Sequence, residues 1–129
     1  MSKNTDRFRS IADELAATIR ENEDTERLFY ERKAAVLSSN PLTVIFQRRR
    51  EIADFLDMPS RKRRSLLQRQ PPDPALLETA ALAEAALQVT ARGLEAWDNA
   101  GLLTDEPLLP STAFLLTMGF LDACFAKAR

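Results

Sequence analysis

The chain has 129 residues, enough for one domain with a buried core, and its 18 basic and 19 acidic residues leave a net charge of −1. Hydrophobic residues make up 45% and charged residues 29%, a balance typical of a folded domain rather than a disordered chain. With no histidine, one cysteine and three scattered glycines, the sequence excludes Ser-His triads, histidine-bearing metal sites, zinc knuckles and phosphate-binding glycine loops. We therefore expect a non-enzymatic protein without catalytic residues, metal or cofactor.

Alanine, leucine, arginine and glutamate dominate the sequence, which favours helix over strand at nearly every position. Hydrophobic residues recur at three- and four-residue spacing along most of the chain. The sequence therefore predicts an all-α protein: a single helical domain over residues 1–129, built as an antiparallel bundle of four to five helices with coiled-coil-like spacing in places.

The first helix is expected over about residues 5–38. Its apolar stripe is Phe8, Ile11, Leu15 and Ile19, continued by Leu28, Phe29, Val36 and Leu37. The polar stretch between these two halves leaves open a second interpretation, in which two helices meet near residues 22–25. We favour the single helix because no glycine or proline interrupts it.

A boundary is predicted before Pro41, because Asn40 suits the N-cap and proline suits the first position of a new helix. That helix is expected over about 41–58. Pro59 then interrupts or kinks the chain, since proline lacks an N–H and clashes with the preceding turn. A basic helix follows over about 60–70.

Three prolines around Asp73 mark the firmest break in the chain, and Asp73 is expected to cap a helix over about 74–99. Its apolar positions alternate by four and three residues: Leu76, Ala80, Ala83, Leu87, Thr90, Leu94 and Trp97. This spacing predicts the seam of an antiparallel bundle or a short coiled coil. Gly101 marks the end of the helix, and a last helix is expected over about 112–127.

The last helix is apolar on nearly all sides, which requires burial over most of its surface. One face comprises Phe114, Leu115, Met118, Leu121 and Phe125, and a second comprises Leu116, Phe120 and Cys124. It is either the central helix of the domain or a helix that packs on the domain with one face and on a partner with the other.

The second interpretation predicts a protein-binding role, as an adaptor, chaperone or regulator, with a homodimer or a heteromer as the assembly. The candidate interface residues lie on the last helix and in the loop over 102–109 before it: Phe114, Leu116, Phe120, Cys124, Leu108 and Leu109.

Charge is strongly segregated along the chain: residues 41–70 carry a net charge of +5 and residues 71–129 a net charge of −5. One interpretation is a solvated basic face with acidic residues of the 74–99 helix opposite it, which would set helix pairing within the bundle. The alternative is a DNA-binding helix-turn-helix within residues 47–70. Its recognition helix would carry Arg61, Lys62, Arg63 and Arg64.

Two features weigh against DNA binding. The register directs Arg63 inward, where an unpaired guanidinium is costly, and Asp57 stands where such turns usually carry glycine. The residues before Glu51 are also expected to continue into the next helix without a turn. The path of the chain at Pro59 discriminates between the interpretations: a sharp turn favours DNA binding, whereas a gentle kink favours the bundle.

We expect a cytoplasmic protein that does not enter a membrane. The first ten residues contain no apolar run. The longest apolar stretch lies near residues 113–121 and is shorter than the roughly 18–20 residues that span a bilayer.

Two segments carry a resemblance to a known family: ERKAAVLSSNPLTVIFQRRREIADFL at residues 31–56 and DPALLETAALAEAALQVTARGLEAW at residues 73–97. In helix length and leucine spacing, the chain over about residues 5–98 resembles the flagellar hook-filament junction export chaperones. These are small all-helical cytoplasmic proteins of bacteria that hold axial proteins for type III export. The resemblance implies a protein-binding role and assigns no functional residue.

Overall fold

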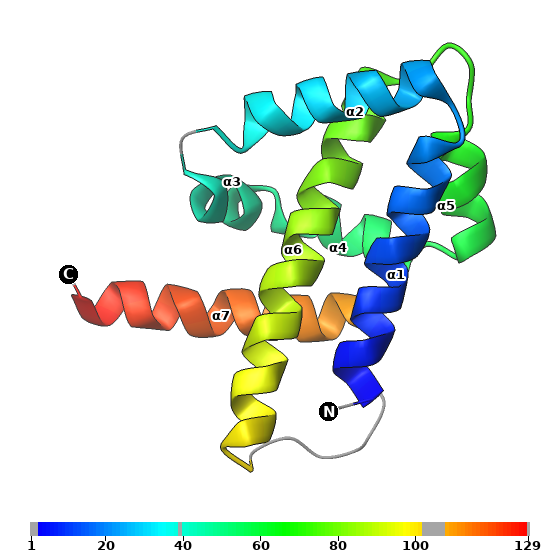
Figure 1. Ribbon diagram of the computed structural model, residues 1–129. Helices are drawn as coiled ribbons and strands as arrows, with labels where there is room; N and C mark the ends of the chain where they lie inside the picture. Colours follow the sequence, from blue (N-terminus) through cyan, green and yellow to red (C-terminus); the bar gives the residue numbers. More distant parts are fainter. Residues whose placement is uncertain (1–2, 39, 102–107, 129) are drawn as a thin grey trace.

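The computed structural model describes the backbone of residues 3–38, 40–101 and 108–128, and the side chains of residues 4–38, 40–101 and 108–119. In these ranges it contains seven α-helices and no strand, so the predicted all-α helical bundle is confirmed (Figure 1). The helices are α1 (Lys3–Arg20), α2 (Glu23–Val36), α3 (Pro41–Gln47), α4 (Arg49–Asp57), α5 (Ser60–Leu67), α6 (Pro74–Asn99) and α7 (Pro110–Ala128).

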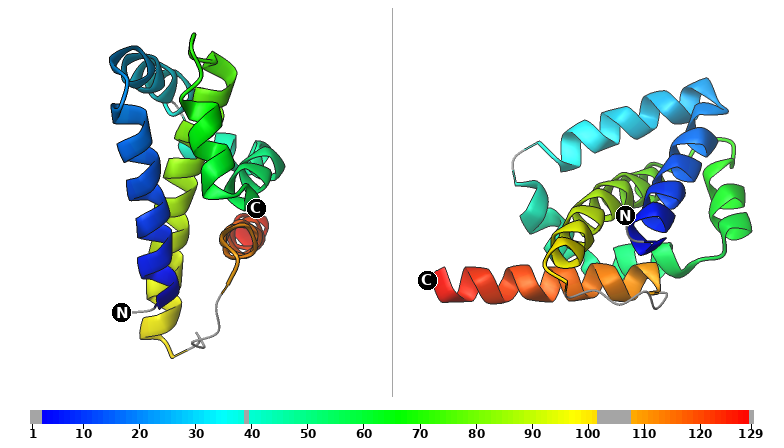
Figure 2. Two further views of the ribbon diagram at one scale, coloured as in Figure 1. Left: turned by 90° about the vertical axis from the view of Figure 1, so that its right-hand side faces the viewer. Right: turned by 60° about the horizontal axis from the view of Figure 1, so that its bottom comes forward.

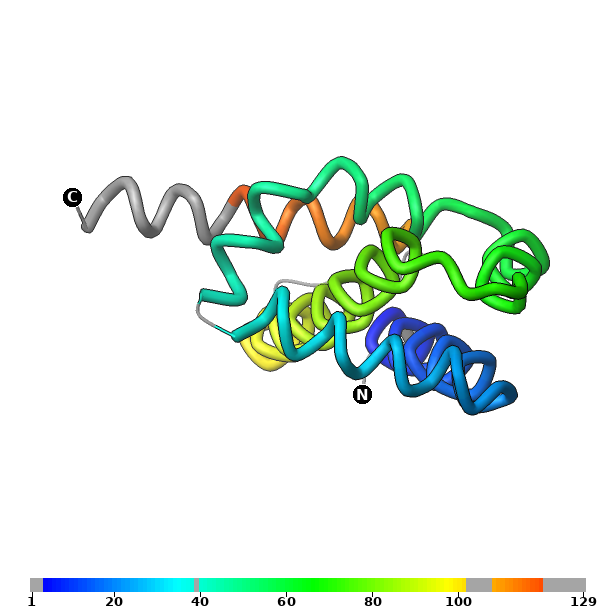
Figure 3. Tube along the Cα trace, turned by 90° about the horizontal axis from the view of Figure 1, so that it is seen from above, coloured from blue at the N-terminus to red at the C-terminus, as the bar shows by residue number. Residues whose placement is uncertain are grey.

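Helix α6 is the centre of the fold and contacts α1, α2, α4, α5 and α7. Helix α1 runs antiparallel beside α6, whereas α2, α4 and α7 cross α6 at steep angles (Figures 1 and 2). Seen from above, α4 and α7 lie together on the side of α6 that faces away from α2 (Figure 3). The core therefore forms around α6, and α7 covers one side of it.

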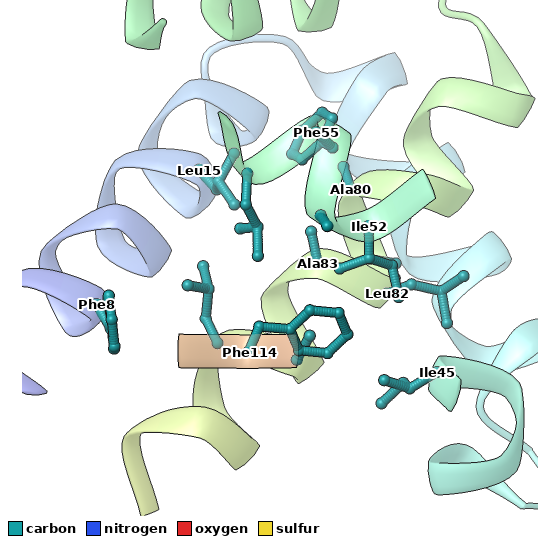
Figure 4. Packing of buried hydrophobic residues seen from close by; sticks show 14 of the residues in the cluster. Phe8, Leu15, Ile45, Ile52, Phe55, Ala80, Leu82, Ala83 and Phe114 are labelled. Carbon is teal, nitrogen blue, oxygen red and sulfur yellow. The ribbon is translucent and has the colours of Figure 1, made fainter. Parts of the chain in front are cut away.

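Small side chains allow α6 to be surrounded in this way. Its alanines at positions 80, 81, 83, 86 and 91 are all buried, so that neighbouring helices can approach the backbone closely. The large side chains that fill the space come from the helices around it, and Figure 4 shows three of them, Phe8 of α1, Phe55 of α4 and Phe114 of α7. These three rings are at most 1% exposed.

The predicted seam of α6 is buried from Ala80 to Leu94. Leu77, Leu82 and Ala86, which lie outside that seam, are buried as well. Helix α6 therefore occupies the central position that the sequence left open for the last helix. Its ends follow the local signals, because the Asp73 carboxylate accepts a hydrogen bond from the N–H of Ala75 at 3.0 Å and Gly101 adopts a φ of 73°.

The expectation of one helix over 5–38 is wrong, because α1 ends at Arg20 and α2 begins at Glu23. Asn22 causes the break by capping α2: its side-chain oxygen accepts hydrogen bonds from the N–H groups of Asp24 and Thr25 at 3.0 and 3.1 Å. Acidic residues in the first turn of α2 suit the positive end of the helix dipole. The break lets α2 turn across α6 and bury Phe29.

The helix expected over 41–58 is also divided, because Arg48 has a φ of −106° and a ψ of 21° between α3 and α4. Its guanidinium donates to both carboxylate oxygens of Glu51, at 2.8 and 3.0 Å, and to Glu78 of α6 at 2.6 Å. The Thr79 hydroxyl donates to Glu51 at 2.9 Å. This cluster ties the junction of α3 and α4 to the start of α6.

Acidic side chains of α6 pair with bases from three other elements. Besides the pair of Glu78 with Arg48, Glu84 pairs with Lys33 of α2 at 2.7 Å, and Glu95 pairs with Arg9 of α1. The expected pairing of this helix with the basic segment therefore holds at Glu78. The other two pairs join α6 to the N-terminal helices.

The Arg48 cluster makes the stability of the protein depend on pH. The hydrogen bonds from Arg48 hold the pKa of Glu51 below its ordinary value; partial burial opposes this shift, and the Thr79 hydroxyl adds to it. A lowered pKa in the folded state stabilises the protein fully above the ordinary glutamate pKa. This contribution is lost as the pH falls through the lower folded value.

We predict that Glu51→Gln lowers the free energy of unfolding at pH 7 and that the difference from wild type shrinks as the pH falls below about 4, in the range of the ordinary glutamate pKa. Urea unfolding at both pH values measures this. Glu31→Gln, at an exposed position of α2, is the matched control and should change stability little. An equal loss at both pH values in Glu51→Gln would contradict the role assigned to its charge.

Candidate functional site

The start of α7 is held in place by the start of α1. The Asn4 side chain is 1% exposed, and its oxygen accepts a hydrogen bond from the N–H of Leu108 at 3.0 Å. Arg7 donates to the carbonyl oxygen of Leu108 at 3.5 Å. Sequence reasoning did not single out Asn4 or Arg7, because polar residues near a chain start carry no pattern that distinguishes a buried contact from a solvated side chain.

Helix α7 has one face in the core and one face exposed. Ala113, Phe114 and Met118 are at most 2% exposed and pack toward α4 and α6. On the other side, Leu115 is 41% and Leu116 is 51% exposed, and Leu109 before the helix is 66% exposed. We call Leu109, Leu115 and Leu116 the outer leucines.

The structure divides the residues predicted for the interface. Phe114 fills the core, and Leu108 is partly buried against it, whereas Leu109 and Leu116 are exposed. Leu115, which the sequence placed on the face opposite Leu116, is exposed too, and the helical spacing alone gave no sign of this. The side chains of Phe120 and Cys124, and the loop over 102–107, lie outside the described residues.

A groove of about 270 Å³ runs between α4 and α7 beside the outer leucines. Its lining contains both charge signs and one leucine: Arg49, Arg50, Ala53, Asp54, Asp57, Ser111 and Leu115. Arg49 lies over the ring of Phe46 at 4.2 Å and donates to the Phe46 carbonyl oxygen at 2.8 Å. By contrast, the side chains of Arg50, Asp54 and Asp57 form no hydrogen bond or ion pair with another described residue.

The chain makes a sharp turn at Pro59. Met58 and Pro59 both have extended backbone, with ψ angles of 142° and 143°, and α5 leaves at a steep angle to α4 (Figures 1 and 2). A gentle kink in one long helix is therefore excluded. A turn between two crossed helices is the geometry that the DNA-binding alternative requires.

Arg63 is buried, with 5% of its surface exposed, and it binds the turn that precedes its own helix. Its guanidinium donates to the carbonyl oxygens of Leu56, at 3.1 Å, and Met58, and to the hydroxyl of Ser60 at 3.2 Å. Burial lowers the pKa of Arg63, and the charge of Glu14 opposes this shift. The inward register predicted for Arg63 is correct, and carbonyl groups at the end of α4 take the place of a carboxylate partner.

The rest of the predicted basic cluster does not form one continuous surface. Arg64 pairs with Glu21, in the turn after α1, at 2.9 Å, and Gln68 donates to the same carboxylate. Ser60, one turn earlier on α5, donates to Glu14 of α1 at 3.3 Å. One side of α5 therefore lies against acidic side chains of α1 and of the turn that follows it.

Arg61 and Lys62 of α5, and Arg69 in the turn after it, remain exposed. The side chains of these three residues form no hydrogen bond or ion pair with another described residue. The basic surface available to a ligand is therefore smaller than the sequence predicted.

Neither a protein-family model, a curated protein nor a solved structure matches this chain. No helix in the described ranges is long and apolar enough to cross a bilayer. Among the same residues, no cluster of three or more cysteine, aspartate or glutamate side chains is placed to hold a metal ion. The two candidate sites among the described residues are therefore the outer leucines of α7 with the adjacent groove, and the exposed basic residues of α5.

We predict that Arg63→Ala lowers the free energy of unfolding by about 1–3 kcal/mol, because the carbonyl groups of Leu56 and Met58 lose their donor and a buried side chain is removed. Arg61→Ala removes the same chemical group from an exposed position and is the matched control, expected to change stability by less than about 0.5 kcal/mol. Denaturant unfolding compares them. Equal effects of the two substitutions would show that the buried contacts of Arg63 contribute nothing.

Proposed function

We propose that this protein binds another protein through the outer leucines of α7. The observation that carries the proposal is the exposure of Leu115 and Leu116 on a helix whose other face is packed into the core, and of Leu109 directly before that helix. The role is that of an adaptor, chaperone or regulator, with no catalytic step.

The arrangement of the outer leucines supports a docking face rather than scattered exposure. Single exposed leucines are common on protein surfaces. Leu115 and Leu116 are adjacent on α7, and Leu109 directly precedes the helix, so the three exposed leucines lie close together along the chain. Thr112 and Gly119 are exposed on the same stretch and are small, so a partner helix could approach closely.

The resemblance to flagellar export chaperones agrees with a protein-binding role and stays a prediction. Self-association is the simpler assembly, because a two-fold axis covers the same patch on both copies.

We predict that Leu116→Glu abolishes association while the helix content survives, because Leu116 is half exposed and lies outside the core. Light scattering at tens of micromolar protein measures the mass, and circular dichroism measures the helix content. Leu42→Glu, at an exposed leucine of α3, is the matched control and should leave association unchanged. A wild-type monomer, or a dimer that tolerates Leu116→Glu and fails with Leu42→Glu, would contradict the proposal.

A second candidate function, DNA binding through α5, is favoured by one observation, the sharp turn at Pro59 between crossed helices. Two observations weigh against it. Arg63 is directed into the protein, and the carboxylates of Glu14 and Glu21 lie along one side of α5, where they would repel a phosphate backbone. We therefore rank it below protein binding.

We predict no duplex DNA binding at physiological salt. The measurement is fluorescence anisotropy over a salt series, with wild type and with the triple variant Arg61→Gln, Lys62→Gln and Arg69→Gln. Arg92→Gln, at an exposed position of α6, is the control. Binding that weakens steeply with salt, is lost in the triple variant and persists in the control would establish the second candidate instead.

A further inference from the structure

We propose that the partner of the outer leucines is a second copy of this chain, docked across α4 and α7 about a two-fold axis, so that Arg50 of each copy lies between Asp54 and Asp57 of the other. This inference rests on the proposed function and names the partner and the geometry. It comes from the three charged groups on the outer face of α4, which have no counterpart within the described part of the chain.

The first observation is that Arg50 and Asp54 do not pair with each other, although their spacing on the helix would allow it. Arg50 and Asp54 are four residues apart on one helix, a spacing at which opposite charges often pair. Both are exposed, together with Asp57, and none of the three contacts an opposite charge among the described residues. Arg48, only two positions away, binds two carboxylates. The outer face of α4 thus carries three charges that no described residue neutralises.

The second observation is that the order of these charges opposes the helix dipole. The N-terminal end of a helix favours negative side chains and the C-terminal end favours positive ones. Helix α4 has Arg49 and Arg50 beside Glu51 in its first turn and ends at Asp57, with no basic residue in its last turn. Arg50 and Asp57 are therefore unfavourably placed with respect to the helix dipole, and a contact with opposite charges would offset this.

A two-fold contact would place opposite charges of the two copies against one another. In an isologous dimer, each patch meets the same patch of the other copy. With α4 helices antiparallel and the axis passing at position 53, Arg50 lies level with position 56 of the second copy, between Asp54 and Asp57. At a rise of about 1.5 Å per residue, Asp57 is then about 1.5 Å to one side of the opposing guanidinium along the helix axis and Asp54 about 3 Å to the other.

The centre of this contact is suited to close approach. Ala53 is small and 6% exposed, and it lines the groove of about 270 Å³ between α4 and α7. Leu115 borders the same groove and is continuous with Leu116 on α7. One contact would therefore cover the unpaired charges of α4 and the outer leucines of α7 together.

A partner with a single charge sign fits this surface less well. An acidic segment would pair with Arg50 and leave Asp54 and Asp57 desolvated beside like charge, and a basic segment would do the reverse. A second copy supplies both signs in the complementary order. A copy of this chain is therefore a better fit to this surface than an unrelated protein with one sign of charge.

Charge reversal tests the geometry. Arg50→Asp and Asp57→Arg should each raise the dimer dissociation constant at least about tenfold, because each places like charges opposite one another twice per dimer. The double variant Arg50→Asp/Asp57→Arg should recover much of the affinity that either single variant loses, since the exchanged charges face each other again, while the unchanged Asp54 beside the new carboxylate keeps the dissociation constant above that of wild type. Both changes suit the helix dipole, so the fold should survive, and circular dichroism checks this.

Sedimentation velocity over a concentration series measures the dissociation constants, and Arg61→Asp is the control for charge reversal outside the contact. If wild type dimerises, Leu116→Glu abolishes the dimer, and the single reversals have no effect, the proposed function stands and this inference is overturned. Single reversals that weaken the dimer without rescue by the double variant overturn it too. A wild-type monomer contradicts both.

Discussion

The packing of four helices against the small side chains of α6 is the constraint on which the rest of the structure depends. Alanine extends little beyond its Cβ atom, so α1, α2, α4 and α7 approach α6 closely from different sides. Aromatic rings from the surrounding helices, such as Phe8 and Phe55, fill the space between them. Because α2 crosses α6 steeply, it cannot continue the line of α1, and the break at Asn22 follows from this.

Charge sets how the surrounding helices are placed. The α6 residues Glu78, Glu84 and Glu95 each pair with a base from a different element, so part of the opposite net charges along the chain is neutralised internally. Arg63 lies inside the fold and satisfies backbone carbonyl groups at the end of α4. Among the charges left on the surface are a small basic patch on α5 and the charges on the outer face of α4.

Helix α7 joins the core to the surface proposed for binding. Its inner side is part of the same cluster as α4 and α6, and its start is tied to α1 through Asn4. The outer leucines are therefore presented on a helix whose position is set by the core, which reduces the entropy lost when a partner docks. The adjacent face of α4 places charged side chains beside the outer leucines. One surface therefore supplies both the charges that would orient a partner and the apolar contact that would bind it.

The sequence by itself determined the helical class, the limits of α6 and the start of α3, because these depend on local chemistry: Asp73 and Asn40 as caps, proline at a first helical position, and Gly101 as a stop. It also determined that Arg63 points inward. Only the tertiary structure decided that one helix ends and another begins at Asn22. An asparagine can cap a helix at many positions, and here the break is stabilised because it lets α2 turn and bury its apolar side chains against α6. Only the tertiary structure placed Phe114 in the core and Leu115 outside it. An α7 that is apolar on nearly all sides has no intrinsic inner face, and contact with α4 and α6 selects one.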